Sequence, residues 1–215
     1  MMEKITALVS ADCRSLYQAG CDALQRGDLD AAIDIFNQAL ESEPGFVLCR
    51  ETLRKAQFDR SRRRNGFFEK AWAEVREVPA LAKAAACLYS RPLKAVHAAE
   101  QVLNHVPTNL LAHKILARAA LKASLPRTAL LSLNFIYPRV SQDINLTLEM
   151  AAALAEAGRV REAISLCGRL LKDYPGNKRV PRLLGYFSKM ASDETVAAGA
   201  KVIQIPPRKP SLSRI

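Results

Sequence analysis

The chain has 215 residues, of which 49% are hydrophobic and only 6% aromatic. Ala and Leu dominate the apolar set, which favours helices over a β-sandwich and argues against a disordered chain. Lys and Arg outnumber Asp and Glu by 32 to 21, so the net charge of +11 suits an acidic partner such as an anionic peptide, nucleic acid or lipid surface.

The first predicted element is a helical hairpin over residues 12–45. Its second helix lies in GDLDAAIDIFNQALESEP, residues 27–44, where Ala32 follows Gly27 by five residues and Pro44 follows it by seventeen. Gly27 permits the positive φ of a tight turn, and Pro44 cannot continue a helix. We therefore expect a turn at each end of this helix.

Residues 46–78 form a divergent second unit. The sequence FVLCRETLRKAQFDRSRRR, residues 46–64, predicts one long helix, and GFFEKAWAEVREV, residues 66–78, predicts a short helix that Pro79 ends. The next copy of the opening pattern starts at Ser90, 63 residues after Gly27 and five short of two 34-residue periods. An irregular hairpin is needed to fill this interval.

Three further units follow, over residues 79–108, 109–142 and 143–176. Copies of the pattern start at Ser90, Ser124 and Gly158, each 34 residues after the one before. In the copy at Ser124, Pro138 comes three residues early. A period of 34 residues predicts a stack of helical hairpins, in which each unit covers the apolar face of its neighbour.

Residues 177–194 predict a single helix that caps the stack. The following TVAAGAKVIQIPPRKPSLSRI, residues 195–215, loses helical periodicity and ends in a Pro-rich basic stretch. We expect a solvated tail, in which Pro207 and Pro210 form a P-x-x-P that is also the pattern of a docking peptide.

These marks resemble the tetratricopeptide repeat family, which places small residues where two helices cross and a Pro after the second helix. The first copy carries Gly20, Gly27, Ala32, Phe36, Ala39 and Pro44, and the last carries Ala151, Gly158, Ala163, Leu170 and Pro175, with Cys167 where an aromatic residue is usual. The resemblance implies an all-α, right-handed superhelix of about five hairpins plus a capping helix, with a concave groove that binds a segment of another protein.

The family lines its groove with the first helix of each hairpin, and residues four apart on the side away from the core are the candidates. They are Glu51 and Lys55 in the divergent unit, Lys114, Arg118 and Lys122 in the fourth, and Arg182, Tyr186 and Lys189 in the cap. The stripe predicts a positive groove for the carboxylates of a partner. Lys114 and Arg118 resemble part of the family's carboxylate clamp, whose other positions here hold Tyr17, Cys21, Ala80 and Ala84.

Catalytic chemistry has little support in the sequence. It contains no phosphate-binding Gly-rich loop, no H-E-x-x-H and no G-x-S-x-G. His97, His105 and His113 fall on different helices, so we interpret them as surface or packing residues rather than metal ligands. We expect neither an enzyme nor a cofactor.

The cysteines and the N-terminal residues bear on the compartment. Cys13, Cys21, Cys49, Cys87 and Cys167 are an odd number, lie far apart and form no C-x-x-C, which argues against disulfides or zinc and favours small buried thiols in a reducing compartment. The opening MMEKITALVSADCRS lacks the pattern of an export signal, and no apolar run approaches the roughly 18 residues of a membrane span. We expect a cytoplasmic protein.

Three functions remain open on the sequence. The leading one is a non-catalytic adaptor or scaffold that binds a partner segment in the groove, with Arg60, Arg62, Arg63 and Arg64 as a second, solvent-exposed basic patch. The second is binding to nucleic acid or an anionic membrane through DRSRRRN and PPRKPSLSRI, although these runs lack interleaved aromatic residues. The third is a secretion chaperone of the tetratricopeptide type.

Overall fold

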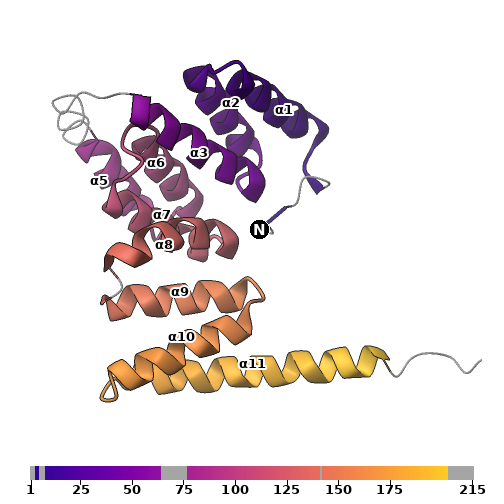
Figure 1. The fold of residues 1–215 in the computed structure, drawn as a ribbon, viewed down its shortest axis with the longest axis vertical. Helices are drawn as coiled ribbons and strands as arrows, with labels where there is room; N and C mark the ends of the chain where they lie inside the picture. Colours follow the sequence, from indigo (N-terminus) through magenta and orange to yellow (C-terminus); the bar gives the residue numbers. More distant parts are fainter. Residues whose placement is uncertain (1–2, 5–7, 64–76, 141, 203–215) are drawn as a thin grey trace, which may run out of the picture.

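The computed structural model describes residues 3–4, 8–63, 77–140 and 142–202. Within these ranges the fold is all-α, with ten helices and one isolated β-bridge between Lys4 and Phe46. None of the helices described is long and apolar enough to cross a membrane. The predicted all-α solenoid is confirmed (Figure 1).

The helices, in chain order, are α1 (Ala11–Gln25), α2 (Leu29–Ser42), α3 (Val47–Arg63), α5 (Val78–Cys87), α6 (Pro92–His105), α7 (Leu110–Lys122), α8 (Pro126–Val140), α9 (Ile144–Glu156), α10 (Val160–Asp173) and α11 (Arg179–Val202). The predicted short helix over 66–78 lies almost wholly outside the described residues. Val78 and Pro79 belong to the first turn of α5, where a proline is tolerated because its missing N–H has no helical partner.

The 34-residue period is visible in the turns and caps. Asn109 and Asp143 cap α7 and α9, each side chain accepting a hydrogen bond from the backbone N–H three residues on. Gly158 has φ +79° in the turn between α9 and α10, and Ser124 takes φ +58° at the equivalent turn between α7 and α8. The repeated sequence thus builds repeated helix ends.

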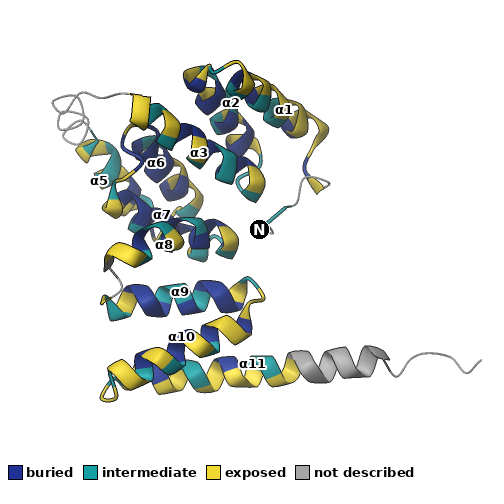
Figure 2. Ribbon diagram, in the orientation of Figure 1, coloured by how far each residue is buried: buried dark blue, intermediate teal, exposed yellow. Residues whose placement is uncertain are grey.

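Consecutive helices pack side by side from α5 to α11, and α1, α2 and α3 form a second such group. Buried apolar side chains follow this division: one cluster runs from Ala84 to Phe187, and the other lies among α1, α2 and α3. Figure 2 shows α7 mostly buried at the centre of the stack and α11 with many exposed residues at its end. The molecule therefore has two hydrophobic cores.

Helix α3 joins these two cores by packing against α6 and α8, the second helices of the next two hairpins. Arg50 pairs with Glu100 on α6 at 2.8 Å, and the ring centroid of Phe58 lies 5.1 Å from that of Phe135 on α8. Near the N-terminus, Glu3 accepts hydrogen bonds from the backbone N–H groups of Arg127 and Thr128 in the first turn of α8. The first group of helices thus folds back onto the second.

The end of the chain differs from the expectation in one respect. Helix α11 continues to Val202 instead of ending at residue 194. Ala197, Ala198 and Ala200 are strong helix formers, and no proline intervenes before Pro206, so the helix extends beyond its packed part. The Pro-rich end of the predicted tail, residues 203–215, lies outside the described residues.

Candidate functional site

The first helices of the last two hairpins and the capping helix share one surface, connected by polar side chains. Lys114 on α7 lies 3.3 Å from Asp143 at the start of α9, and Arg118 lies 2.8 Å from Glu149 on α9. Arg179 on α11 donates a hydrogen bond of 2.7 Å to the Asn145 side chain on α9. We call this three-helix surface the charged face. It contains Lys114, Arg118, Lys122, Asn145, Glu149, Arg179, Arg182, Tyr186 and Lys189.

The charges of Lys114 and Arg118 are already compensated within the protein. Burial alone would raise the pKa of Asp143, but the Leu146 N–H and the Lys114 ammonium more than offset this and lower it. Asp143 therefore stays ionised beside Lys114, as a helix-capping carboxylate should. The two predicted cations are structural partners of α9 rather than free positive charges.

Other predicted residues of this face are more available. The Lys122 ammonium lies 4.5 Å from the ring centre of Tyr89, and both side chains are exposed. On α11, Arg182 and Lys189 are exposed, without a salt bridge among the residues described, and Tyr186 between them is 61% exposed. An exposed aromatic ring between two cations is suited to contact a partner chain.

Glu51 and Lys55 are not brought to the charged face. Both lie on α3, which packs against α2, α6 and α8, whereas Lys114 and Arg118 lie on α7 and face α9. The prediction that they share one groove assumed that the divergent unit continues the row of first helices. The fold-back of α3 separates them instead.

The predicted basic patch is also smaller than expected. Arg60 is not solvent-exposed: its side chain is 13% exposed, and it pairs with Asp30 at 2.6 Å and donates to the Asn104 carbonyl. Arg63 donates to the Gly27 carbonyl at 3.1 Å. Arg62 is 81% exposed beside Asp59, and Arg64 lies outside the described residues. Because α3 packs between α2 and α6, it uses two of these arginines to hold the fold.

A buried polar network lies between α3 and α6. Glu100, whose side chain is 4% exposed, pairs with Arg50 at 2.8 Å and with Arg54 at 2.9 Å. Gln57 donates hydrogen bonds to Glu100 and Asn104. Burial would raise the pKa of Glu100, but the two arginines and Gln57 lower it. The ionised carboxylate faces two guanidinium groups, so this network has one positive charge in excess.

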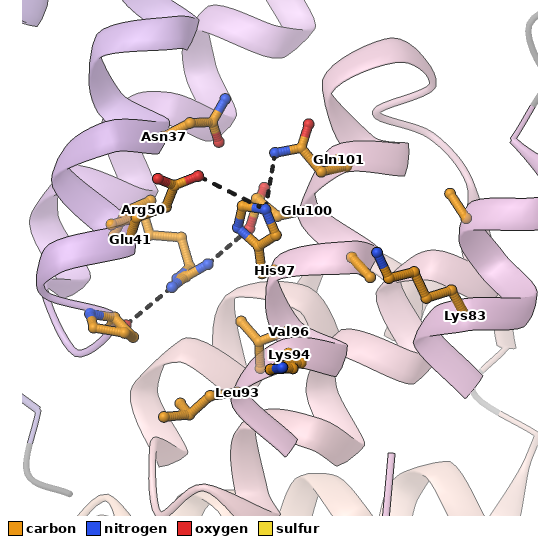
Figure 3. A pocket seen from close by; sticks show the side chains of 14 residues that line it. Asn37, Glu41, Arg50, Lys83, Leu93, Lys94, Val96, His97, Glu100 and Gln101 are labelled. Carbon is orange, nitrogen blue, oxygen red and sulfur yellow. Dashed lines mark hydrogen bonds and ion pairs between the residues drawn. The ribbon is translucent and has the colours of Figure 1, made fainter. Parts of the chain in front are cut away.

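A pocket of about 590 Å³ opens beside this network (Figure 3). Its walls come from the C-terminal half of α2, the start of α3, and helices α5 and α6. They include Asn37, Leu40, Glu41, Pro44, Arg50, Ala80, Lys83, Leu93, Lys94, Val96, His97, Ala98, Glu100 and Gln101. Sequence reasoning missed the pocket, because its walls come from segments up to 64 residues apart, Asn37 to Gln101, with no shared motif.

The histidines and cysteines show packing rather than catalytic geometry. His113 is buried, with Nε2 3.0 Å from the Pro107 carbonyl and Nδ1 3.2 Å from the Ser132 hydroxyl, whereas His97 and His105 are exposed. Cys13, Cys49 and Cys167 are buried, and burial raises the pKa of Cys49 to about 12. No group of potential metal ligands is found within the described ranges.

Comparison with known proteins supports the repeat. Residues 147–177 match the family model for the tetratricopeptide repeat. No curated protein matches the chain.

Among solved structures, the fold is similar to the TPR domain of P58(IPK), with 11% identity and a TM-score of 0.51, covering 91% of this chain and 69% of that one. It is also similar to MamA from Desulfovibrio magneticus RS-1, with 15% identity and a TM-score of 0.44, covering 91% of this chain and 96% of that one. The matched segment lies in α9 and α10, where the small residues and turn of the repeat are seen in three dimensions. The repeat at 147–177 and the shared helical-hairpin fold identify the chain as a tetratricopeptide repeat protein.

Proposed function

We propose that this protein is a non-catalytic adaptor that binds a segment of another protein on the charged face of α7, α9 and α11. The observation that carries the proposal is the exposed α11 stripe of Arg182, Tyr186 and Lys189, which is not covered by another helix. Protein binding is the general role of stacked helical repeats, since each hairpin adds area to an extended surface.

The charges of this face suggest the chemistry of the partner. Lys114 and Arg118 already have carboxylates opposite them, so acidic groups of a partner would pair with Lys122, Arg182 and Lys189. Tyr186 offers apolar area and a hydroxyl between the two α11 cations. A segment that combines acidic and aromatic or apolar side chains matches this surface.

Binding to nucleic acid or membranes through the basic patch has less support. Arg60 and Arg63 both contact the first hairpin, so of the residues placed in the structure only Arg62 presents its cation freely to solvent. Counterion release from phosphates needs several such cations close together.

The test is an affinity purification from nuclease-treated native extract, with bound proteins identified by mass spectrometry at low and high salt. The variant is Arg182→Glu/Lys189→Glu, and the control Arg169→Glu/Lys172→Glu reverses two exposed charges on α10. We expect one protein to bind the wild type and the control in both salts and to be lost from the variant. Equal recovery with all three proteins would refute the proposed face.

A further inference from the structure

We propose a second binding site, in which the pocket between α2–α3 and α5–α6 takes a short peptide segment that alternates acidic and apolar side chains. The pocket shares no residue with the charged face. Its volume of about 590 Å³ falls within the range of about 300–1,000 Å³ that is usual for ligand sites. The inference does not depend on the function proposed above.

Electrostatics favour an anionic group in this pocket. Lys83 on α5 and Lys94 on α6 are exposed on its walls and have no salt bridge within the part of the chain that the structure describes. The acids of the lining already have partners: Glu41 lies 3.8 Å from His97, and Glu100 is shared by Arg50 and Arg54. The cations of the lining are therefore the groups left to attract a ligand.

The floor of the pocket adds a buried donor without a partner. The Arg50 side chain is 3% exposed, and it donates to Glu100 at 2.8 Å and to the Pro44 carbonyl at 2.9 Å. Its Nε–H has no hydrogen-bond partner. Buried donors are rarely left unpaired in proteins, so this one is consistent with a ligand-binding floor.

Apolar side chains and amides distinguish a peptide from a simple anion. Leu40, Leu93 and Val96 line the pocket, and Leu93 is 38% exposed, so apolar surface is available next to the lysines. Asn37 on α2 and Gln101 on α6 face the opening from its two walls (Figure 3). Their amides can donate to and accept from a peptide backbone. Nucleic acid is a poorer match, because no aromatic side chain lines the pocket for base stacking.

The experiment uses the full chain and a fluorescein-labelled hexapeptide, acetyl-Ser-Asp-Leu-Glu-Leu-Ser-amide, with anisotropy as the readout. We expect saturable binding to the wild type and an increase in Kd of about tenfold or more for Lys83→Glu/Lys94→Glu, because two attractive charges become repulsive. Leu93→Ser should raise Kd by roughly fivefold through lost apolar contact. A peptide with Asn and Gln in place of its acids should bind weakly.

Two control proteins make the result specific to the pocket. Arg169→Glu/Lys172→Glu changes the net charge by the same amount on α10, and Arg182→Glu/Lys189→Glu changes it on the charged face; both should bind like the wild type. Circular dichroism establishes that each variant keeps its helices.

Three results would overturn the proposal. One is a wild type that shows no saturable binding up to about 1 mM peptide. Another is an equal loss of affinity in all three charge reversals, which would indicate non-specific attraction. The third is an oligothymidylate that binds more tightly than the peptide and is released by the Lys83→Glu/Lys94→Glu change.

Discussion

Gly20 shows how a single residue sets the distance between two helices. A Cβ atom built at Gly20 on α1 would lie 2.4 Å from Cε1 of Phe36 on α2, a ring that is fully buried. Gly20→Ala should therefore lower the free energy of unfolding by about 1–3 kcal/mol, despite the better helix propensity of Ala. Urea denaturation measures this change. The control Gly185→Ala on α11 meets no atom within 4 Å and should raise stability by about 0.5–1 kcal/mol. If both variants lose stability equally, the close approach at Gly20 is not the cause.

His113 predicts a pH dependence of stability. Burial, assisted by the Arg54 charge, lowers the pKa of His113 to about 4 from its ordinary 6.5, so the folded protein holds the neutral ring. Its Nε2–H then donates to the Pro107 carbonyl, and Nδ1 accepts from Ser132.

The unfolded chain takes up this proton near pH 6.5 and the folded protein only near pH 4, so stability falls as the pH drops through this interval. We expect His113 to account for a loss of about 3 kcal/mol between pH 7 and pH 4. Urea denaturation at several pH values should show a shallower slope for His113→Gln than for the wild type. The exposed His97→Gln variant should keep the wild-type slope. Identical slopes for His113→Gln and wild type would show that His113 is not the titrating group.

At the scale of helices, the local features were predictable and the long-range ones were not. The 34-residue period places Asn109 and Asp143 at equivalent helix starts, and the structure uses both as caps. The same step from Arg118 leads to Ala152, whereas its actual partner is Glu149. Charge pairing across the face depends on how adjacent helices are rotated, which periodicity does not specify.

Helix α3 illustrates the same limit more strongly. Its sequence predicts a long helix correctly, but its hydrophobic residues do not reveal which neighbour it contacts. The contacts that place it are single polar pairs distant in sequence, such as Arg50 with Glu100, 50 residues apart. A basic run in this helix was interpreted as a solvent-exposed patch because nothing local distinguishes Arg60, which reaches Asp30, from Arg62, which does not.

At the scale of the whole molecule, two apolar cores meet across a polar contact. The core of α1–α3 and that of α5–α11 are separate clusters, and the Arg50, Arg54, Gln57, Glu100 and Asn104 side chains lie between them. Hydrophobic contact holds each group together, whereas directional bonds fix one group on the other. The pocket lies at the edge of this junction, so a peptide bound there would touch both groups.

The junction should therefore be separable from the rest of the fold. Glu100→Gln removes the carboxylate opposite two buried guanidinium groups and should lower the free energy of unfolding by about 3–5 kcal/mol. Hydrogen exchange read by mass spectrometry should show faster exchange in α1–α3, while α9–α11 keeps the wild-type rate because its contacts do not pass through α3. Asp59→Asn on the exposed side of α3 should change neither region. Faster exchange spread evenly over all helices would mean that the two cores open together, and an unchanged rate in α1–α3 would mean that the buried ion pairs do not hold the junction.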